Sequence, residues 1–333
     1  MSLFKKIQKA NELIKPYIYE TPLEKSILIS NEYSTNVFLK CEHLQKTGSF
    51  KFRGALNKIL SLSDSEKQKG VIAASSGNHG QGVALAAHIM QVSATIYVPE
   101  DASQIKIDLI KAYGAKVKIC PGNCLNSEIE ARKDAEKNSI NFISPYNDHT
   151  VIAGQGTIGI ELIEQCQNLD AIFISVGGGG LISGIATYLK QVKPNTKIIA
   201  CWPENAPTMF ECIKAGKIIE VEEKQTLSDG TAGGVEPGAI TLPICSDLID
   251  DFSLVSENEI KSAMKLLAKN ERFIIEGAAG VAMAGFLKNH EKFEGKNVAI
   301  VLCGRNIDYE KYIEAIEAIE AIEAIEAIEA IED

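Results

Sequence analysis

The chain has 333 residues, and its hydrophobic content of 45% is enough to build two lobes or one large domain around a core. The formal net charge is -10, but the C-terminal tail carries eight acidic residues and no basic ones, which leaves -2 for the rest of the chain. A nearly neutral body gives no electrostatic argument for a nucleic-acid partner.

Eight cysteines are scattered along the chain without any C-x-x-C pair, and the N-terminus shows no obvious targeting peptide. This usage disfavours a disulfide framework or a zinc site and predicts a protein of the reducing cytoplasm. The longest apolar runs have the length of strands, so we expect no membrane-spanning segment.

Taken in chain order, a helix is predicted from Leu3 to Ile14, then a break at Pro16 and Pro22, and then a strand at 37–42. A helix should follow Lys51. Further strands are predicted at 71–74, 94–98, 116–120, 141–144, 171–176, 197–201 and 298–302, and further helices at 83–90, 103–113, 127–137, 159–165 and 257–268.

Apolar strands that alternate with helices predict an α/β fold with a mostly parallel, doubly wound sheet. Ligands of such sheets bind at the carboxyl ends of the strands. Three polar or glycine-rich segments stand at those ends, namely Ser75–Gly80, Gly177–Leu181 and Cys303–Asn306. We therefore expect these segments to converge on one site.

Lys51 stands between two phenylalanines at the predicted start of a helix, directly after Gly48 and Ser49. The Ser49 side chain is predicted to cap that helix. The positive helix end and partial desolvation should then lower the pKa of Lys51. An available amine of this kind forms Schiff bases with carbonyls such as pyridoxal phosphate (PLP), although a surface lysine at the start of an amphipathic helix is the alternative.

Gly177–Gly180 lies between an apolar strand and a helix, where consecutive glycines let several backbone N–H groups approach an anion. This arrangement predicts a phosphate-binding loop, and a flexible glycine loop is the alternative. Neither a dinucleotide fingerprint nor the ending of a P-loop is present.

Ser75–Gly80 offers hydroxyls, an amide and an imidazole at one strand end. A Ser-His hydrolase is disfavoured because no G-x-S-x-G motif is present, and a lone histidine such as His79 is more often structural. Cys303–Asn306 by itself indicates only a turn.

The combination of these motifs resembles the PLP-dependent serine/threonine dehydratase and serine racemase family, which has the tryptophan-synthase-β fold (fold-type II). The resemblance covers about residues 5–310. The motifs that carry it, in this order, are 46–55 (KTGSFKFRGA), 75–81 (SSGNHGQ), 153–159 (AGQGTIG), 177–181 (GGGGL) and 276–280 (EGAAG).

The resemblance implies two lobes, each with a mostly parallel sheet flanked by helices. Residues 1–63 and 149–312 would form the large PLP-binding lobe, and 64–148 would form a smaller lobe inserted in it. The fold type also implies a homodimer or homotetramer.

For the cofactor, the resemblance implies that Lys51 holds PLP and takes the Cα proton of the substrate, and that Phe50 packs on the ring. Asn78 would bind the ring 3-hydroxyl, and Cys303 would contact the pyridine nitrogen. The phosphate would lie against the backbone of Gly177, Gly178, Gly179, Gly180 and Leu181.

For the substrate, the resemblance implies that the carboxylate of an amino acid binds at Ser75, Ser76, Gly77, Asn78 and His79. Ser76 corresponds to the serine on the opposite face of the cofactor, which exchanges a second proton in racemases and can be a bystander in dehydratases.

The implied reaction is the deaminating dehydration of L-threonine and L-serine to 2-oxobutanoate or pyruvate and ammonia. Serine racemase with a side dehydratase activity is the alternative. A cysteine-synthase-like β-replacement enzyme, or a phosphate-binding protein without catalysis, is less well supported by the motifs.

The sequence departs from the family where metal-activated racemases carry their divalent-cation ligands. Trp202 and Thr208 stand at the two positions that would supply carboxylates, and neither is a hard-cation ligand. Glu204, Glu211 and Asp229 are nearby acids, but their spacing gives no support. We therefore predict no metal site of the usual kind, and this favours a dehydratase over a racemase.

The tail at 313–333 repeats Ile-Glu-Ala six times and ends in Ile-Glu-Asp. Since a helix advances about 100° per residue, a three-residue repeat rotates each isoleucine by about 60° from the last and should form no continuous apolar face. We predict a helical or disordered extension without a catalytic role, with a partner-binding helix as the alternative. No regulatory domain is recognisable after Asp308, so feedback by isoleucine is not expected.

Overall fold

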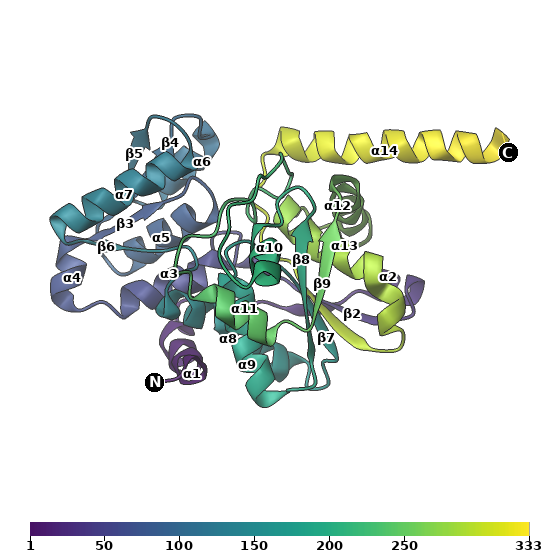
Figure 1. The fold of residues 1–333 in the computed structure, drawn as a ribbon, viewed down its shortest axis with the longest axis horizontal. Helices are drawn as coiled ribbons and strands as arrows, with labels where there is room; N and C mark the ends of the chain where they lie inside the picture. Colours follow the sequence, from purple (N-terminus) through teal and green to yellow (C-terminus); the bar gives the residue numbers. More distant parts are fainter. Residues whose placement is uncertain (333) are drawn as a thin grey trace.

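The computed structural model describes the backbone of residues 1–332 and the side chains of residues 1–320. Two sheets organise it (Figure 1). The larger has six strands in the order β1-β2-β10-β7-β8-β9, and the smaller has four in the order β5-β4-β3-β6. Strand pairing is parallel throughout both sheets apart from β1 with β2, which confirms the predicted fold class.

The strands of the large sheet come from both ends of the chain, and those of the small sheet come from a single stretch between them. The large sheet contains β1 (Leu23–Lys25), β2 (Asn36–Lys40), β7 (Ala171–Ser175), β8 (Lys197–Pro203), β9 (Asp251–Val255) and β10 (Asn297–Val301). The small sheet contains β3 (Val71–Ala74), β4 (Ala94–Pro99), β5 (Lys116–Cys120) and β6 (Asn141–Phe142).

Helices cover both faces of each sheet. Those beside the large sheet are α1 (Leu3–Ile14), α2 (Ile27–Glu32), α8 (His149–Gln165), α9 (Gly180–Val192), α10 (Thr208–Ala215), α11 (Thr241–Leu248), α12 (Glu257–Glu271) and α13 (Gly277–Asn289). Those beside the small sheet are α3 (Lys51–Leu60), α4 (Asp64–Lys69), α5 (Asn78–Ile89), α6 (Gln104–Ala112) and α7 (Cys124–Asn138). Two short 3-10 turns, Glu42–Leu44 and His290–Phe293, and the C-terminal helix α14 (Tyr309–Glu332) complete the chain.

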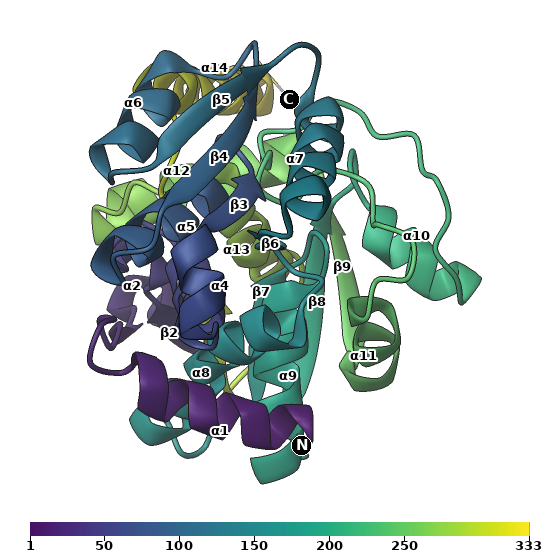
Figure 2. The same ribbon diagram turned by 90° about the vertical axis from the view of Figure 1, so that its left-hand side faces the viewer.

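The core of the large sheet explains why its strands are continuous apolar runs. In β7 every residue is buried, because α9 packs on one face of the sheet and α13 on the other. Figure 2 shows α8 and α9 together with α1 below them, and α10 and α11 on the β9 side of the sheet.

Two helices begin earlier than the sequence predicted. Helix α5 begins at Asn78 instead of Val83, and α8 begins at His149 instead of Gly159. Both extensions contain glycines that permit close approach. A Cβ at Gly80 would lie 2.0 Å from the Ser75 carbonyl oxygen, and one at Gly156 would lie 2.7 Å from Ile7 Cδ1. Glycine has a low helix propensity, so these residues predict the end of a helix. In the structure they lie inside helices, where the missing side chain allows close packing.

The beginning of the tail packs against α12, beside the large sheet. Tyr312, Ala315 and Ile319 are buried on one side of α14, which contacts α12, and Lys265 pairs with Glu320 at 3.5 Å. The expectation that no apolar face forms is therefore wrong for these turns, because an alanine of the repeat shares a face with an isoleucine. The α14 backbone then extends away from the sheets (Figure 1).

Within the described residues, no helix combines the length and the apolar character that crossing a membrane requires.

Candidate active site

The loop before Lys51 is held against the end of β10. Ser49 forms an antiparallel bridge with Gly304, and the Phe50 backbone N–H donates to the Cys303 carbonyl oxygen at 3.1 Å. Gly48 has a φ of +70°, a conformation that glycine adopts without strain. The first and last candidate segments of the chain are therefore adjacent.

The predicted helix cap is wrong. Helix α3 begins at Lys51 with Phe50 at the N-cap, and no side chain caps it. The Ser49 hydroxyl is buried without a hydrogen-bond partner in the described part of the chain. Ser49 is extended because it pairs with Gly304, and it stands one residue before Phe50, the N-cap. Its side chain therefore does not cap the helix.

The amine of Lys51 lies in a largely apolar setting. Its Nζ donates to the Pro145 carbonyl oxygen at 3.1 Å and lies 5.2 Å from the centre of the Phe50 ring. Burial lowers the pKa of Lys51 to about 8, although Cys303 and Glu276 act in the opposite direction. The predicted direction of the shift is confirmed, and a substantial fraction of this amine is neutral at mildly alkaline pH.

The Ser75–Gly80 segment turns from β3 directly into α5. The Ser75 hydroxyl accepts a hydrogen bond from the Gly77 N–H at 3.1 Å, and Ser76 is half-buried beside it. The His79 ring is directed at the backbone instead, with Nε2 2.8 Å from the Ile143 carbonyl oxygen. Burial lowers the pKa of His79 to about 3, so the ring is neutral.

The tetraglycine loop is shaped by its lack of side chains. A Cβ at Gly178 would lie 2.4 Å from the Tyr146 ring, and Gly179 has a φ of +83°. The Thr241 hydroxyl donates to the Gly178 carbonyl oxygen at 2.7 Å. Helix α9 starts at Gly180, so its free N–H groups and the positive end of its dipole point toward this loop.

The segments from the two sheets meet at one carboxyl group, that of Glu276. Asn78 Nδ2 donates to its two oxygens at 2.8 and 3.0 Å, and the Asn306 N–H donates at 3.1 Å. Cys303 Sγ lies 3.9 Å from Glu276 Oε1 and 3.5 Å from the Ser175 hydroxyl. The predicted convergence of Ser75–Gly80 with Cys303–Asn306 is therefore found.

Glu276 itself was missed as a site residue, because it was noted only as part of a glycine- and alanine-rich motif. Burial raises the pKa of Glu276 to about 7, and burial likewise raises the pKa of Cys303. The available signal was a single acid in the otherwise uncharged stretch from Phe273 to Leu287.

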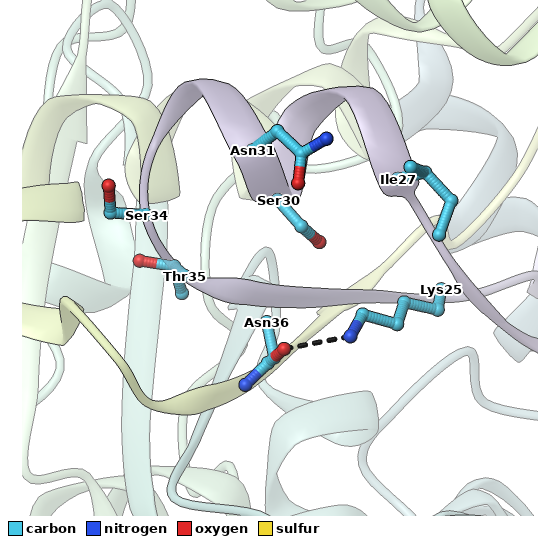
Figure 3. A pocket seen from close by; sticks show the side chains of 7 residues that line it. All are labelled: Lys25, Ile27, Ser30, Asn31, Ser34, Thr35 and Asn36. Carbon is cyan, nitrogen blue, oxygen red and sulfur yellow. Dashed lines mark hydrogen bonds between the residues drawn. The ribbon is translucent and has the colours of Figure 1, made fainter.

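Two surface hollows lie away from these residues. One of about 160 Å³ is lined by Lys25, Ile27, Ser30, Asn31, Ser34, Thr35 and Asn36, and Lys25 Nζ donates to Asn36 Oδ1 at 2.8 Å (Figure 3). The other, of about 410 Å³, includes Asp170, Thr196 and Asn297. Both lie at the amino ends of the large-sheet strands, opposite the edge where ligands of such sheets bind.

The two positions that the resemblance aligns with cation ligands, Trp202 and Thr208, contact other groups in the structure. Trp202 is fully buried beside Phe210 and Phe252, with ring centres 5.7 and 5.9 Å away. The Thr208 hydroxyl donates to the carboxylate of Glu223. The nearby acids pair with lysines, Glu204 with Lys288, Glu211 with Lys214 and Asp229 with Lys106. Among the described residues, no cluster of three or more His, Cys, Asp or Glu side chains could hold a metal ion.

Comparison of the sequence with known proteins identifies the family to which the chain belongs. The sequence matches the family of pyridoxal-phosphate dependent enzymes over residues 14–304. A catabolic L-threonine dehydratase of Staphylococcus aureus (strain USA300) is 44% identical over 306 residues, which cover 91% of this chain and 88% of the relative. The chain therefore belongs to the pyridoxal-phosphate dependent enzymes, as the motifs predicted.

Solved structures of two enzymes closely resemble the fold of this chain. The processed form of threonine deaminase isoform 2 from Solanum lycopersicum has a TM-score of 0.91 at 37% identity, covering 95% of this chain and 92% of that chain. Serine racemase from Dictyostelium discoideum has a TM-score of 0.85 at 40% identity, covering 92% and 98%. The fold-type II architecture is thus shared with both kinds of enzyme.

The residues present fit this cofactor. Lys51 would offer its aldehyde an amine of lowered pKa, and the glycine loop would offer its phosphate backbone N–H groups without side chains.

Proposed function

We propose that this protein catalyses the deaminating dehydration of L-threonine and L-serine, giving 2-oxobutanoate or pyruvate and ammonia. The observation that carries the proposal is the Lys51 amine, whose pKa is lowered to about 8, in a chain 44% identical to a catabolic L-threonine dehydratase. The other predicted site segments stand at the carboxyl ends of strands around it.

PLP, when bound, supplies an electron sink for the carbanion that forms when the Cα proton leaves. Lys51 would hold the cofactor, and its neutral amine would remove that proton. The N–H groups of Gly177–Leu181 would bind the phosphate, and the Phe50 ring would exclude water beside the amine. Asn78 would recognise the ring hydroxyl and Cys303 the ring nitrogen.

The start of α5 binds the substrate carboxylate. The N–H groups of Asn78 and His79 are in the first turn of this helix, where an anion is favoured. The His79 side chain takes no part, because its ring is neutral and directed at Ile143. Ser75, Ser76 and Gly77 form the turn that leads the chain into this position.

Replacing Lys51 by alanine tests the assignment. We expect Lys51→Ala to lower the rate of 2-oxo acid formation from L-threonine by at least about a thousandfold, because general-base transfer by a positioned side chain is worth about 10²–10⁴. The 2-oxo acid is measured as its hydrazone. Lys58→Ala, on the same helix but facing Asp148, is the control and should retain activity. Turnover of serine by Lys51→Ala would refute the assignment.

Serine racemisation is the second candidate function. It is favoured by the structural likeness to a serine racemase at 40% identity and by the position of Ser76 directly after β3. Ser76→Ala should abolish D-serine formation if Ser76 supplies the second proton, and should leave pyruvate formation within about threefold. A variant that loses pyruvate formation as well would assign Ser76 to both reactions.

We also propose the division into lobes and the assembly. Residues 64–148 form the smaller lobe, supported by the four-stranded sheet that they contain, and 1–63 with 149–312 form the larger. A homodimer or homotetramer, active in the cytoplasm, is the expected assembly. The eight cysteines, all free, support a reducing location.

A further inference from the structure

Glu276 stands at the N-cap of α13 but does not cap it. Its side chain makes no hydrogen bond to that helix and turns instead toward the site, with only 3% of the residue exposed. Gly304 makes room for it, since a Cβ there would lie 2.4 Å from Glu276 Oε1. The fold therefore admits a carboxyl group at a place where an apolar residue would be easier to bury.

No cation compensates this acid directly. No ion pair within the described residues includes Glu276, and its partners are the Asn78 amide, the Asn306 N–H and the Cys303 thiol. Burial raises its pKa to about 7, with Asp229 adding to the rise and Lys106 opposing it. Buried acids without a cation are costly to the fold and cluster at functional sites.

The hydrogen bonds of Glu276 fix the orientation of one amide. The ionised form of Glu276 only accepts hydrogen bonds, so above the Glu276 pKa of about 7 the Asn78 end that faces it is Nδ2. Asn306 Nδ2 donates to Asn78 Oδ1 at 2.6 Å and closes the pair from the other side. Both ends of the Asn78 amide are thereby assigned. Rotating this amide by 180° would place Asn78 Nδ2 against Asn306 Nδ2, so that two donors would face each other.

We propose that Glu276 is a positioning residue that holds the Asn78 amide in the orientation needed to recognise the 3-hydroxyl of the cofactor ring. The role of Asn78 in this inference rests on the proposed function, and the new element is that Glu276 fixes the orientation of the Asn78 amide. Glu276 acts through Asn78, and its contribution is selectivity for a ring that carries the hydroxyl.

The test compares the binding of two cofactors to cofactor-free protein by equilibrium dialysis. One is PLP, and the other is 3-deoxypyridoxal phosphate, which lacks only the hydroxyl. The wild-type protein should bind PLP more tightly by about tenfold or more, the usual cost of an unmade hydrogen bond to an oriented group. In Glu276→Gln this preference should fall to about twofold or less, because a glutamine can both donate and accept and no longer fixes the Asn78 amide.

Two further variants complete the design. Glu257→Gln is the matched control, because Glu257 accepts from the Leu227 N–H at 2.8 Å outside the site, and it should keep the wild-type preference. Glu276→Asp retains an acceptor-only group and should give a preference between those of wild type and Glu276→Gln. This variant also provides the test if the glutamine variant does not fold.

A Glu276→Gln protein that weakens both cofactors equally would overturn the proposal, because a purely structural role predicts that result. An unchanged preference would overturn it as well. Wild-type protein that shows the preference but deaminates neither amino acid would instead refute the proposed function and leave the role of Glu276 standing.

Discussion

Lys51 and Arg53 lie two residues apart on one helix and meet opposite electrostatic surroundings. Arg53 is fully buried, which by itself lowers its pKa, but contacts with Glu42 at 2.8 Å and Glu161 at 2.5 Å outweigh burial and raise that pKa above its usual range. Lys51 is partly buried, desolvation lowers the pKa of its amine, and no ion pair among the described residues includes it. Arg53 therefore anchors the helix as a permanent charge, and Lys51 is an amine of lowered pKa.

The pKa of Lys51 gives a prediction on pH. In cofactor-free protein the amine should become half-neutral near pH 8 instead of its ordinary 10.5, so its reactivity should rise as pH increases through 8. Competitive acetylation between pH 6 and 11, read by mass spectrometry of the Lys51 peptide, measures this. The folded protein should also gain stability between about pH 8 and 10.5 relative to Lys51→Met, because the unfolded lysine binds more protons there. Half-labelling near pH 10.5 would contradict the assignment.

At the scale of elements, turns and glycines do most to place the site. Gly178 lies against the Tyr146 ring, and the Tyr146 hydroxyl accepts from the Glu236 N–H at 2.8 Å. The Gly177–Gly180 loop is thus packed against the segment that follows β6, whose Pro145 carbonyl also contacts the Lys51 amine. The loop is fixed by these contacts and is not a free glycine linker.

Gly178→Ala tests this packing. Its Cβ would fall 2.4 Å from the Tyr146 ring, so we expect a loss of about 1–3 kcal/mol in the free energy of unfolding and weaker binding of PLP. Urea unfolding and equilibrium dialysis measure the two effects. Gly234→Ala is the control, because nothing lies within 4 Å of a Cβ there and stability should change by less than about 0.5 kcal/mol. Equal stability of the two variants would show that Tyr146 can move away at no cost.

At the scale of the molecule, the site is assembled between the two sheets. Asn78 follows β3 of the small sheet and bonds to Glu276 and Asn306 beside the large sheet. Arg132 of α7 also reaches across, pairing with Glu236 at 2.7 Å. Movement of the small sheet relative to the large sheet would therefore break these hydrogen bonds and this ion pair directly.

The chain after β8 is held by hydrogen bonds to one carboxylate, that of Glu223. The Thr208 hydroxyl and the Gly233 N–H both donate to the Glu223 carboxylate, which joins α10 to the loop before α11. We expect 2-oxo acid formation to be unchanged, within about 1.5-fold, after exhaustive treatment with a chelator and re-addition of Mg²⁺ or Ca²⁺. Coupled assay of pyruvate, with D-serine quantified in the same sample, measures both products. Loss of either product on chelation would show that a divalent cation is bound by residues other than those of the racemases.

The alternation of strands and helices, the family and the lowered pKa of Lys51 could all be predicted from the amino-acid sequence. These follow from local information: apolar runs of strand length, a lysine between aromatics, and a glycine run after a strand. Local information failed where packing overrides propensity, as at the starts of α5 and α8 and in the first turns of α14. It also failed at Ser49, whose backbone pairs with the distant Gly304.

Only the tertiary structure decided that Glu276 belongs to the site. Its partners, Asn78 and Asn306, lie 198 and 30 residues away in sequence, and no spacing rule links them. The pKa values of Lys51 and Glu276 follow from burial, which is a property of the assembled lobes. The sequence specified which groups can do the chemistry, and the fold decided how far they are desolvated and which of them touch, because both depend on contacts between distant segments.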